Sequence, residues 1–182
     1  MSDAGGPPAW IRALEPDAIT VEPSSAGGDP TWVASLSFEL WSGPPLGMAE
    51  DCNKRGGRVV GSLGELSCAE VEIAKRLQVH RWDGGWFNTF GGCGRRRWGD
   101  FMIGRNDILP ATSRLIERVR AELGAAGGVP DVIAWRRKEI IYIESKGPGD
   151  NTNKQREWLA AALRLGLDPR SFALVRWVAR AK

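Results

Sequence analysis

The sequence predicts a small α/β fold, with a mixed central sheet flanked by helices. From residue 65 onward, segments of helical periodicity alternate with short runs rich in β-branched residues. One such run, EIIYIES at residues 139–145, is apolar on both faces at its start, which is typical of a covered central strand. The 182 residues, 42% of them apolar, suffice for one domain or for one domain with an extension.

The first 60 residues are expected to form an N-terminal extension. Glycine, proline, serine and alanine dominate residues 1–30, which predicts a loose lead-in with one short ordered piece at Trp10 to Leu14. Residues 32–41 alternate between apolar and polar side chains, and this alternation predicts a half-buried strand.

A polar, glycine-rich loop or linker over residues 50–61 is expected to separate the extension from the main domain, residues 61–182. This domain begins with a predicted helix over residues 65–79, whose apolar residues form one stripe. Glu70 falls inside that stripe, beside Leu66, where an acid costs desolvation unless it is paired. Two interpretations stay open: Glu70 pairs with an arginine at the edge of the core, or it points at a site in the sheet.

The segment that follows mixes aromatic side chains, glycines and arginines. A strand is possible over residues 86–90, with a glycine-flexible loop after it. In this loop Arg95, Arg96 and Arg97 precede Trp98. Guanidinium groups match the geometry of phosphates, and aromatic rings stack on bases. The cluster is either a nucleic-acid-binding patch or an ordinary surface loop with its tryptophan in the core.

A second helix is expected over residues 112–124, where the run GAAGG ends it. Two strands that can pair as a hairpin come next, VPDVIAW and EIIYIES, joined by the short turn RRK. Both strands are short and dense in β-branched residues, so we expect them near the middle of the sheet.

The run KGPGD turns the chain into an amphipathic helix that continues to about Leu165. Thr152 is the expected N-cap, and Trp158 falls on the apolar face, so we expect it in the core. Gln155 has two open interpretations: it completes a capping box with Thr152, or it reaches back over the strand ends. Residues 171–178 provide the last strand.

Three charged residues converge at one end of the predicted hairpin. Glu144 and Lys146 are two positions apart in a strand and point to the same face, and Asp131 lies opposite them if the strands pair. Neighbouring carboxylates repel each other unless they hold a cation, and oxygen ligands suit Mg²⁺ or Mn²⁺. Such an ion activates water, and a nearby lysine can orient it. A cross-strand salt bridge is the open alternative.

The residues of this hairpin resemble a known family. Pro-Asp at residues 130–131 followed by Glu-Ser-Lys at residues 144–146 is similar to the PD-(D/E)XK nuclease signature. The continuation KGPGD, then Gln155 and Trp158-Leu159, looks like the VRR-NUC domain, the virus-type replication-repair nuclease branch. The resemblance covers about residues 128–178. It implies a restriction-endonuclease-like core and Mg²⁺- or Mn²⁺-dependent hydrolysis of DNA phosphodiester bonds.

The resemblance also implies roles for individual residues. Asp131 and Glu144 would bind the metal, Lys146 would position the nucleophile, and Gln155 would support the site. The family core begins with a helix that often contributes a metal-binding glutamate, and the matches in this chain are Glu70 by face geometry, with Glu72 and Glu65 behind it.

An insertion at residues 91–128 separates the first helix and strand from the Pro-Asp strand, unlike the family's usual arrangement. Because this insertion holds the arginine cluster, we expect it to contribute to substrate binding. The candidate nucleic-acid contacts are Arg95, Arg96, Arg97 and Lys154.

Charge is compatible with a polyanionic partner, although an ordinary solvated surface explains it too. The formal net charge is +3, divided into −4 over residues 1–60 and +7 over residues 61–182. No apolar run is long enough to span a membrane, and no secretory signal is visible. The three widely spaced cysteines favour a reducing cytoplasm. A zinc site built from them and His80 lacks the usual close pairs.

The leading interpretation is therefore a DNA endonuclease that acts in repair, recombination or restriction. An RNA or single-strand nuclease on the same fold stays open as an alternative, as does a non-catalytic nucleic-acid-binding module. DNA is the expected partner, and a homodimer is reasonable because a small nuclease must cut two strands.

Overall fold

A computed structural model describes residues 6–23, 30–39, 69, 72–73, 76–88, 94–97, 110–124 and 129–180. The first elements along the chain are α1 (Ala9–Arg12), β1 (Ala18–Glu22), β2 (Thr31–Glu39), β3 (Asp83–Asn88), β4 (Gly94–Arg97) and α4 (Pro110–Leu123). The remaining elements are β5 (Val132–Arg136), β6 (Glu139–Lys146), α5 (Asn153–Arg164), the 3₁₀ turn η1 (Pro169–Ser171) and β7 (Phe172–Arg180). Residues 69, 72–73 and 76–79 are also helical.

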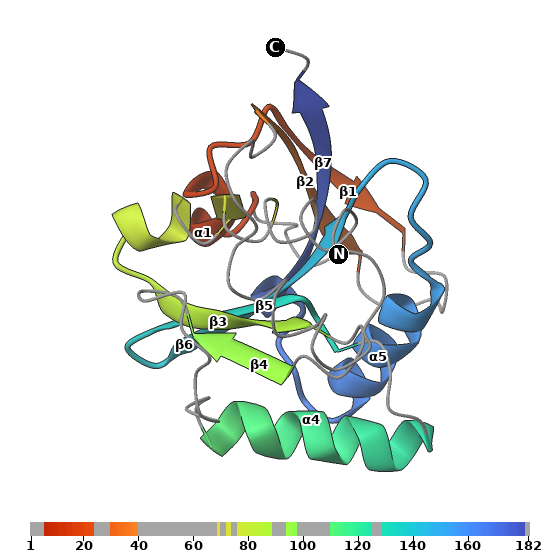
Figure 1. Cartoon of the computed structure of the whole chain (residues 1–182). Helices are drawn as coiled ribbons and strands as arrows, with labels where there is room; N and C mark the ends of the chain where they lie inside the picture. The colour runs from red at the N-terminus through yellow and green to blue at the C-terminus, as the bar shows by residue number, and fades with distance from the viewer. Residues whose placement is uncertain are drawn as a thin grey trace, which may run out of the picture.

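The described strands form one seven-stranded sheet in the order β1-β2-β7-β6-β5-β3-β4 (Figure 1). Three successive strands of this order, β2, β7 and β6, run parallel to one another. The other pairs, β1 with β2, β6 with β5, β5 with β3 and β3 with β4, are antiparallel. This mixed sheet flanked by helices confirms the predicted α/β class.

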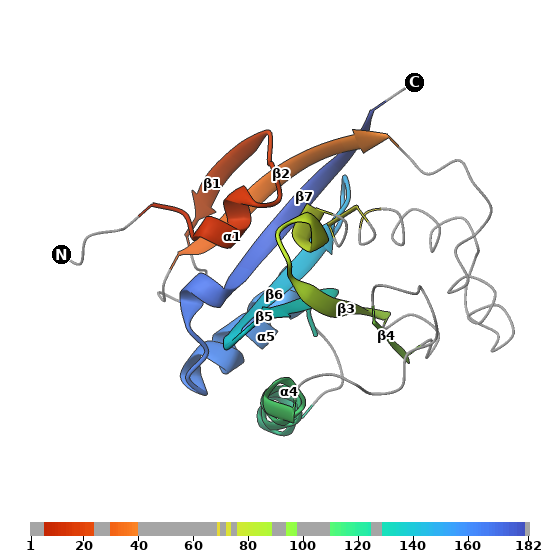
Figure 2. The same ribbon diagram turned by 90° about the vertical axis from the view of Figure 1, so that its left-hand side faces the viewer.

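Two apolar clusters fill the two faces of the sheet. The first cluster includes residues from α1 and the helical residues Ala69, Ile73 and Leu77, and the second includes residues from α4 and α5. Figure 2 shows α1 in front of the β1–β2 end of the sheet and α4 below β5. In β6, Ile141 and Ile143 belong to the first cluster and Tyr142 to the second, because successive side chains alternate between faces. The strand is therefore covered on both sides, as predicted.

The C-terminal half follows the sequence prediction closely. The helix predicted to end at GAAGG ends at Leu123, and Gly124 there has a φ of 61°. Trp158 of α5 is fully buried, with its ring centroid 5.7 Å from that of Tyr142 and 6.4 Å from that of Phe172. Its predicted place in the core is confirmed.

The N-terminal segment is more ordered than the sequence predicts. A short ordered piece at Trp10 to Leu14 is confirmed, since α1 lies there and Trp10, Ile11 and Leu14 are buried in the first cluster. The loose lead-in is wrong for the residues after it, because they form β1. Every described side chain of β1 is exposed or half-buried, as expected for a strand at the edge of the described sheet.

β2 confirms the strand predicted over residues 32–41. It lies between β1 and β7 and pairs in parallel with β7, so the described part of the predicted extension belongs to the same sheet as the rest. The predicted linker at residues 50–61 and the domain boundary beside it lie outside the described residues.

The arginine cluster also differs from the prediction. Its backbone forms β4, which pairs with β3 so that Trp86 lies opposite Arg96. The expected flexible loop is therefore wrong at Gly94–Arg97, because main-chain pairing with β3 overrides a sequence of low β-propensity. Trp98 lies outside the described residues.

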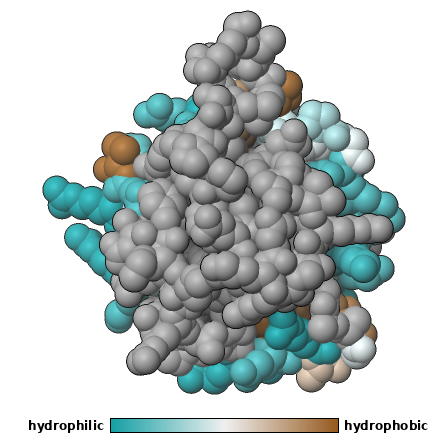
Figure 3. Space-filling model, viewed as in Figure 1, coloured by the Kyte–Doolittle hydropathy of each residue, from teal (hydrophilic) through white to brown (hydrophobic). Residues whose placement is uncertain are grey.

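Polar side chains dominate the visible described surface in Figure 3, where brown patches are small. Among the described residues, the exposed large apolar side chains are Val21, Val79 and Val178. None of the helices in the described part of the chain is long and apolar enough to cross a membrane.

Candidate active site

The β5–β6 hairpin brings the three predicted charged residues to one end. The strands pair antiparallel, with Val132 opposite Ile143. Asp131 immediately precedes Val132, so it lies across from Glu144, and cross-strand partners share a face. The turn is closed by Arg137, whose φ of 57° is in the left-handed region.

Glu144 is a buried acid held by Lys146. The Glu144 side chain is 1% exposed, and its Oε1 lies 2.7 Å from the Lys146 Nζ. Its other oxygen, Oε2, is buried and has no hydrogen-bond donor among the described residues. A buried carboxylate oxygen without a donor is costly, so this atom requires a proton or a cation.

Asp131 is fixed beside Glu144 by the main chain. Its Oδ2 accepts a hydrogen bond of 2.9 Å from the backbone N–H of Ser145. The carboxyl groups of Asp131 and Glu144 are also near enough for each to affect the pKa of the other.

Burial makes both acids hard to ionise. It raises the pKa of Asp131 to about 6, although the Ser145 amide and the charge of Lys146 act in the opposite direction. Burial, followed by the negative charge of Asp131, raises the pKa of Glu144 well above its usual range, and Lys146 offsets only part of this effect. Without a cation, the pair therefore loses its protons at a higher pH than ordinary carboxyl groups do.

The donor set fits a divalent cation. Among the described residues, Glu144 Oε2 is a buried oxygen without a donor, and the carboxyl group of Asp131 is near enough to raise its pKa. Hard oxygen ligands of this kind suit Mg²⁺ or Mn²⁺, which keep several water ligands in such sites. In the described part of the chain, no group of three or more histidine, cysteine, aspartate or glutamate side chains could hold a metal ion. Asp131 and Glu144 would therefore hold the ion with waters or with ligands from elsewhere in the chain.

Of the three glutamates predicted to complete the site from a helix, the structure describes only one. Glu70 and Glu65 lie outside the described residues. Glu72 is described, and it forms a 3.0 Å ion pair with Arg76, which in turn donates to the Leu14 carbonyl at 2.7 Å. Glu72 is thus bonded to a residue that links its helix to the N-terminal segment.

The helix stripe predicted to carry Glu70 packs on the first cluster. Its described members Ala69, Ile73 and Leu77 are all fully buried there. The register gives Glu144 the same face as Tyr142, which belongs to the second cluster. A third carboxylate from this helix would therefore approach the pair from the opposite face of the sheet.

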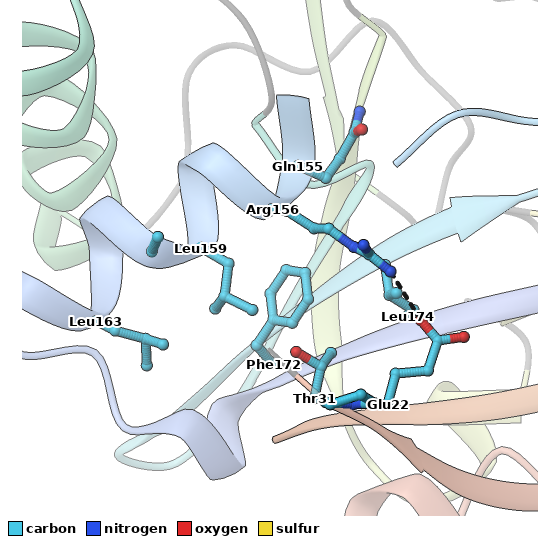
Figure 4. A pocket seen from close by; sticks show the side chains of 10 residues that line it. Glu22, Thr31, Gln155, Arg156, Leu159, Leu163, Phe172 and Leu174 are labelled. Atoms are coloured by element: carbon cyan, nitrogen blue, oxygen red, sulfur yellow. Dashed lines mark hydrogen bonds and ion pairs between the residues drawn. The ribbon is translucent and has the colours of Figure 1, made fainter. Parts of the chain in front are cut away.

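Among the described residues, no contact joins Gln155 to the carboxyl groups of Asp131 and Glu144. It lies in the first turn of α5, and Figure 4 shows its amide pointing away from Leu159 and Phe172. Thr152 occupies the N-cap position as predicted, but its side chain forms no capping bond. The side chain of Asn151 instead accepts from the Asn153 backbone N–H at 2.7 Å, so the proposed capping box is not formed.

Lys154 is exposed on α5, as a contact to a partner requires. The side chains of Arg95, Arg96 and Arg97 lie outside the described part of the structure, so their role stays a prediction. The same holds for the alternative zinc site, of which only His80 is described.

Two further residues act on the site without having been predicted. Asp150, after the glycine-proline turn, raises the pKa of Asp131 by its charge, and its Oδ2 accepts from the Gly147 backbone N–H at 2.8 Å. A Cβ at Gly147 would lie 2.9 Å from the Trp177 ring, so only glycine fits there without a shift. The Gly-x-x-Asp spacing of the turn was the available signal.

Comparison with known proteins finds no relative of this chain. No family model, no curated protein and no solved structure matches the chain.

Proposed function

We propose that this chain is a metal-dependent nuclease that hydrolyses DNA phosphodiester bonds, acting in repair, recombination or restriction. The observation that carries the proposal is the buried pair of Asp131 and Glu144 with Lys146 bonded to it. Replacing a buried charged cluster by apolar groups is often neutral or stabilising, so folding alone gives little reason to bring two acids together. A site for a divalent cation and a phosphate gives such a reason.

Each residue of the cluster has a separate role in the proposed reaction. Asp131 and Glu144 would hold Mg²⁺ or Mn²⁺, which when bound lowers the pKa of its water and neutralises phosphate charge. The Ser145 amide fixes the Asp131 carboxyl. Lys146 is 12% exposed, so its ammonium group borders solvent beside the pair. There it orients the attacking water and stabilises negative charge developing on the phosphorus oxygens.

The order of elements supports a restriction-endonuclease-like core of the VRR-NUC type. After the helical residues 69, 72–73 and 76–79, β3, β5 and β6 form an antiparallel series. Next, α5 connects β6 to the parallel strand β7. The three charged residues lie at the end of β6 from which the chain leaves for α5.

A cleavage assay tests the proposal. Supercoiled plasmid, branched DNA, single-stranded DNA and RNA are incubated with the protein and Mg²⁺, Mn²⁺ or EDTA. We expect metal-dependent cleavage of DNA that Asp131→Ala and Lys146→Ala each reduce at least ~100-fold, the order lost when an electrostatic stabiliser is removed. Glu139→Gln is a matched control, because Glu139 is an exposed acid of the same strand.

The alternatives give different results in the same assay. Cleavage of RNA or single strands alone would change the substrate and keep the mechanism. Binding of DNA without cleavage under either metal would favour a non-catalytic module. If cleavage survives both substitutions, the assigned site is wrong.

A further inference from the structure

Two arginines share one glutamate next to the candidate site. Glu22 ends β1, and its Oε2 lies 3.2 Å from the Arg156 Nη2 of α5. Its Oε1 lies 2.8 Å from the Arg176 Nη2 of β7. Figure 4 shows Arg156 extending from α5 to the Glu22 carboxylate. We call these three residues the Glu22 cluster.

The register of the sheet places this cluster beside Lys146. Arg176 is the partner of Lys146 in the parallel pair β6–β7, and neighbouring strands lie about 4.8 Å apart. Partners across a sheet share a face, so Arg176 leaves β7 on the face from which Lys146 leaves β6. Leu174, the partner of Glu144, lies in the second cluster on that same face. The Glu22 cluster and the acid pair thus occupy neighbouring positions on one face.

The arrangement contributes little to folding. The side chains of Arg156, Arg176 and Glu22 are 41%, 46% and 28% exposed. Exposed ion pairs contribute only about 0–1 kcal/mol, because water and salt screen them. Two guanidinium groups on one carboxylate also leave an excess positive charge. Stability therefore does not explain why two arginines converge here, whereas binding of an anion does.

The geometry of the glutamate indicates which anion fits. Each of its two oxygens faces a different guanidinium group. A backbone phosphodiester carries the same single negative charge and also offers two terminal oxygens, and arginine binds both kinds of anion through its planar fork. A phosphodiester can therefore take the place of the carboxylate between the two arginines.

We propose that Arg156 and Arg176 bind a phosphate of the nucleic-acid backbone that flanks the cleaved one, and that Glu22 occupies them until substrate displaces it. This inference rests on the nuclease function proposed above. Consecutive phosphates of one strand follow each other every ~3.4 Å along the helix axis, so a strand whose reacting phosphate reaches Lys146 presents another nearby. The hollow beside Arg156, lined by Leu159, Phe172 and others, leaves the cluster open on one side (Figure 4).

Binding without turnover tests the proposal. Fluorescence anisotropy of a labelled DNA duplex is measured in EDTA over a range of salt concentrations. Arg156→Ala with Arg176→Ala is expected to weaken binding about 10-fold or more and to lower the slope of log affinity against log salt by about 1–2, because each phosphate contact contributes about 0.9 to that slope. Glu22→Gln is expected to tighten binding several-fold, an effect that misfolding cannot produce.

The pair Arg164–Glu122 supplies the matched control. Arg164 also lies on α5, and its guanidinium is likewise bonded to an exposed carboxylate, but on α4. Arg164→Ala and Glu122→Gln should leave affinity and salt slope unchanged. If the double arginine variant binds like wild type, or if Glu22→Gln does not tighten binding, the inference is wrong.

The two proposals fail in distinguishable ways. Wild-type protein that cleaves DNA, with arginine variants that bind and cleave equally well, overturns the Glu22 cluster alone. Wild-type protein that binds DNA through these arginines but does not cleave it with Mg²⁺ or Mn²⁺ overturns the nuclease function alone.

Discussion

At the scale of single residues, the carboxyl pair governs the chemistry of the site. Asp131 has its pKa raised to about 6 from an ordinary value of 3.8, and the folded protein therefore binds a proton more tightly than the unfolded chain. An acid with a raised folded pKa favours folding below its unfolded pKa, and this contribution is lost as pH rises through the folded value. Metal-free protein should thus lose stability between about pH 4 and pH 7.

Asp131→Asn tests this dependence. The amide cannot ionise and puts no negative charge beside Glu144, so the variant in EDTA should be more stable than wild type at pH 8, by on the order of 2 kcal/mol. At pH 4 the two proteins should have similar melting temperatures. Added Mg²⁺ should stabilise wild type only, because a ligand raises the stability of the state that binds it. Thermal unfolding monitored by circular dichroism measures each effect, and Glu139→Gln is the control.

An opposite result would be informative. If Asp131→Asn lowers the melting temperature in EDTA at pH 8 as much as at pH 4, the two carboxyl groups do not repel each other in the folded protein. The claim that they need a cation would then lose its physical basis.

Residue spacing made the acid pair predictable from the sequence. Glu144 and Lys146 share a face because a strand has a period of two. The turn is one residue shorter than the expected RRK, because Arg136 still pairs with Glu139, and the two residues Arg137 and Lys138 set the antiparallel partner of each position. Gln155 was different, because the orientation of a side chain in the first turn of a helix depends on the cap. The capping bond comes from Asn151 rather than Thr152, and local sequence permits either.

At the scale of elements, apolar runs were predictable and short edge strands were not. β6 and β7 carry continuous apolar residues that no amphipathic helix of that length would have. By contrast, β1 (AITVE) has five residues and β4 (GRRR) has four, and both lie at an edge of the described sheet. Their pairing is decided by the exposed edges of β2 and β3, which are not visible in the local sequence.

The helix α5 offers a prediction about its tryptophan. Trp158 is fully buried between Tyr142 and Phe172, and its indole Nε1 has no hydrogen-bond partner among the described residues. Trp158→Ala should cost about 3–5 kcal/mol in unfolding free energy because it leaves a cavity. Trp158→Phe should cost only about 1–2 kcal/mol, because no hydrogen bond is lost with the indole N–H. Urea denaturation measures both, and equal costs would show that the nitrogen is bonded after all.

At the scale of the whole molecule, the N-terminal segment belongs to the folded unit. β2 supplies the parallel neighbour of β7, and Trp10, Ile11 and Leu14 lie in the first cluster. Arg76 adds bonds to the carbonyls of Leu14 and Glu15. The composition of residues 1–30 predicted a loose lead-in, because contacts that span such long sequence separations leave no local pattern.

Deletion of residues 1–39 should therefore prevent stable folding of the remainder. It removes a sheet neighbour along the whole of β7 and leaves the face beneath α1 exposed to water. Circular dichroism and gel filtration of the truncated protein are the measurements. A truncated chain that unfolds cooperatively, at the same temperature as the full chain, would contradict the prediction.

The acid pair depends on the number of residues in the turn at Arg137. Asp131 and Glu144 share a face because the turn sets a register in which they lie across from each other. One inserted or deleted residue would shift the pairing by one position and send Asp131 to the opposite face of the sheet, while the apolar residues of β5 also changed sides. The length of the turn is thus more constrained than its composition. Insertion or deletion of a single codon there would abolish the acid pair without altering either acid.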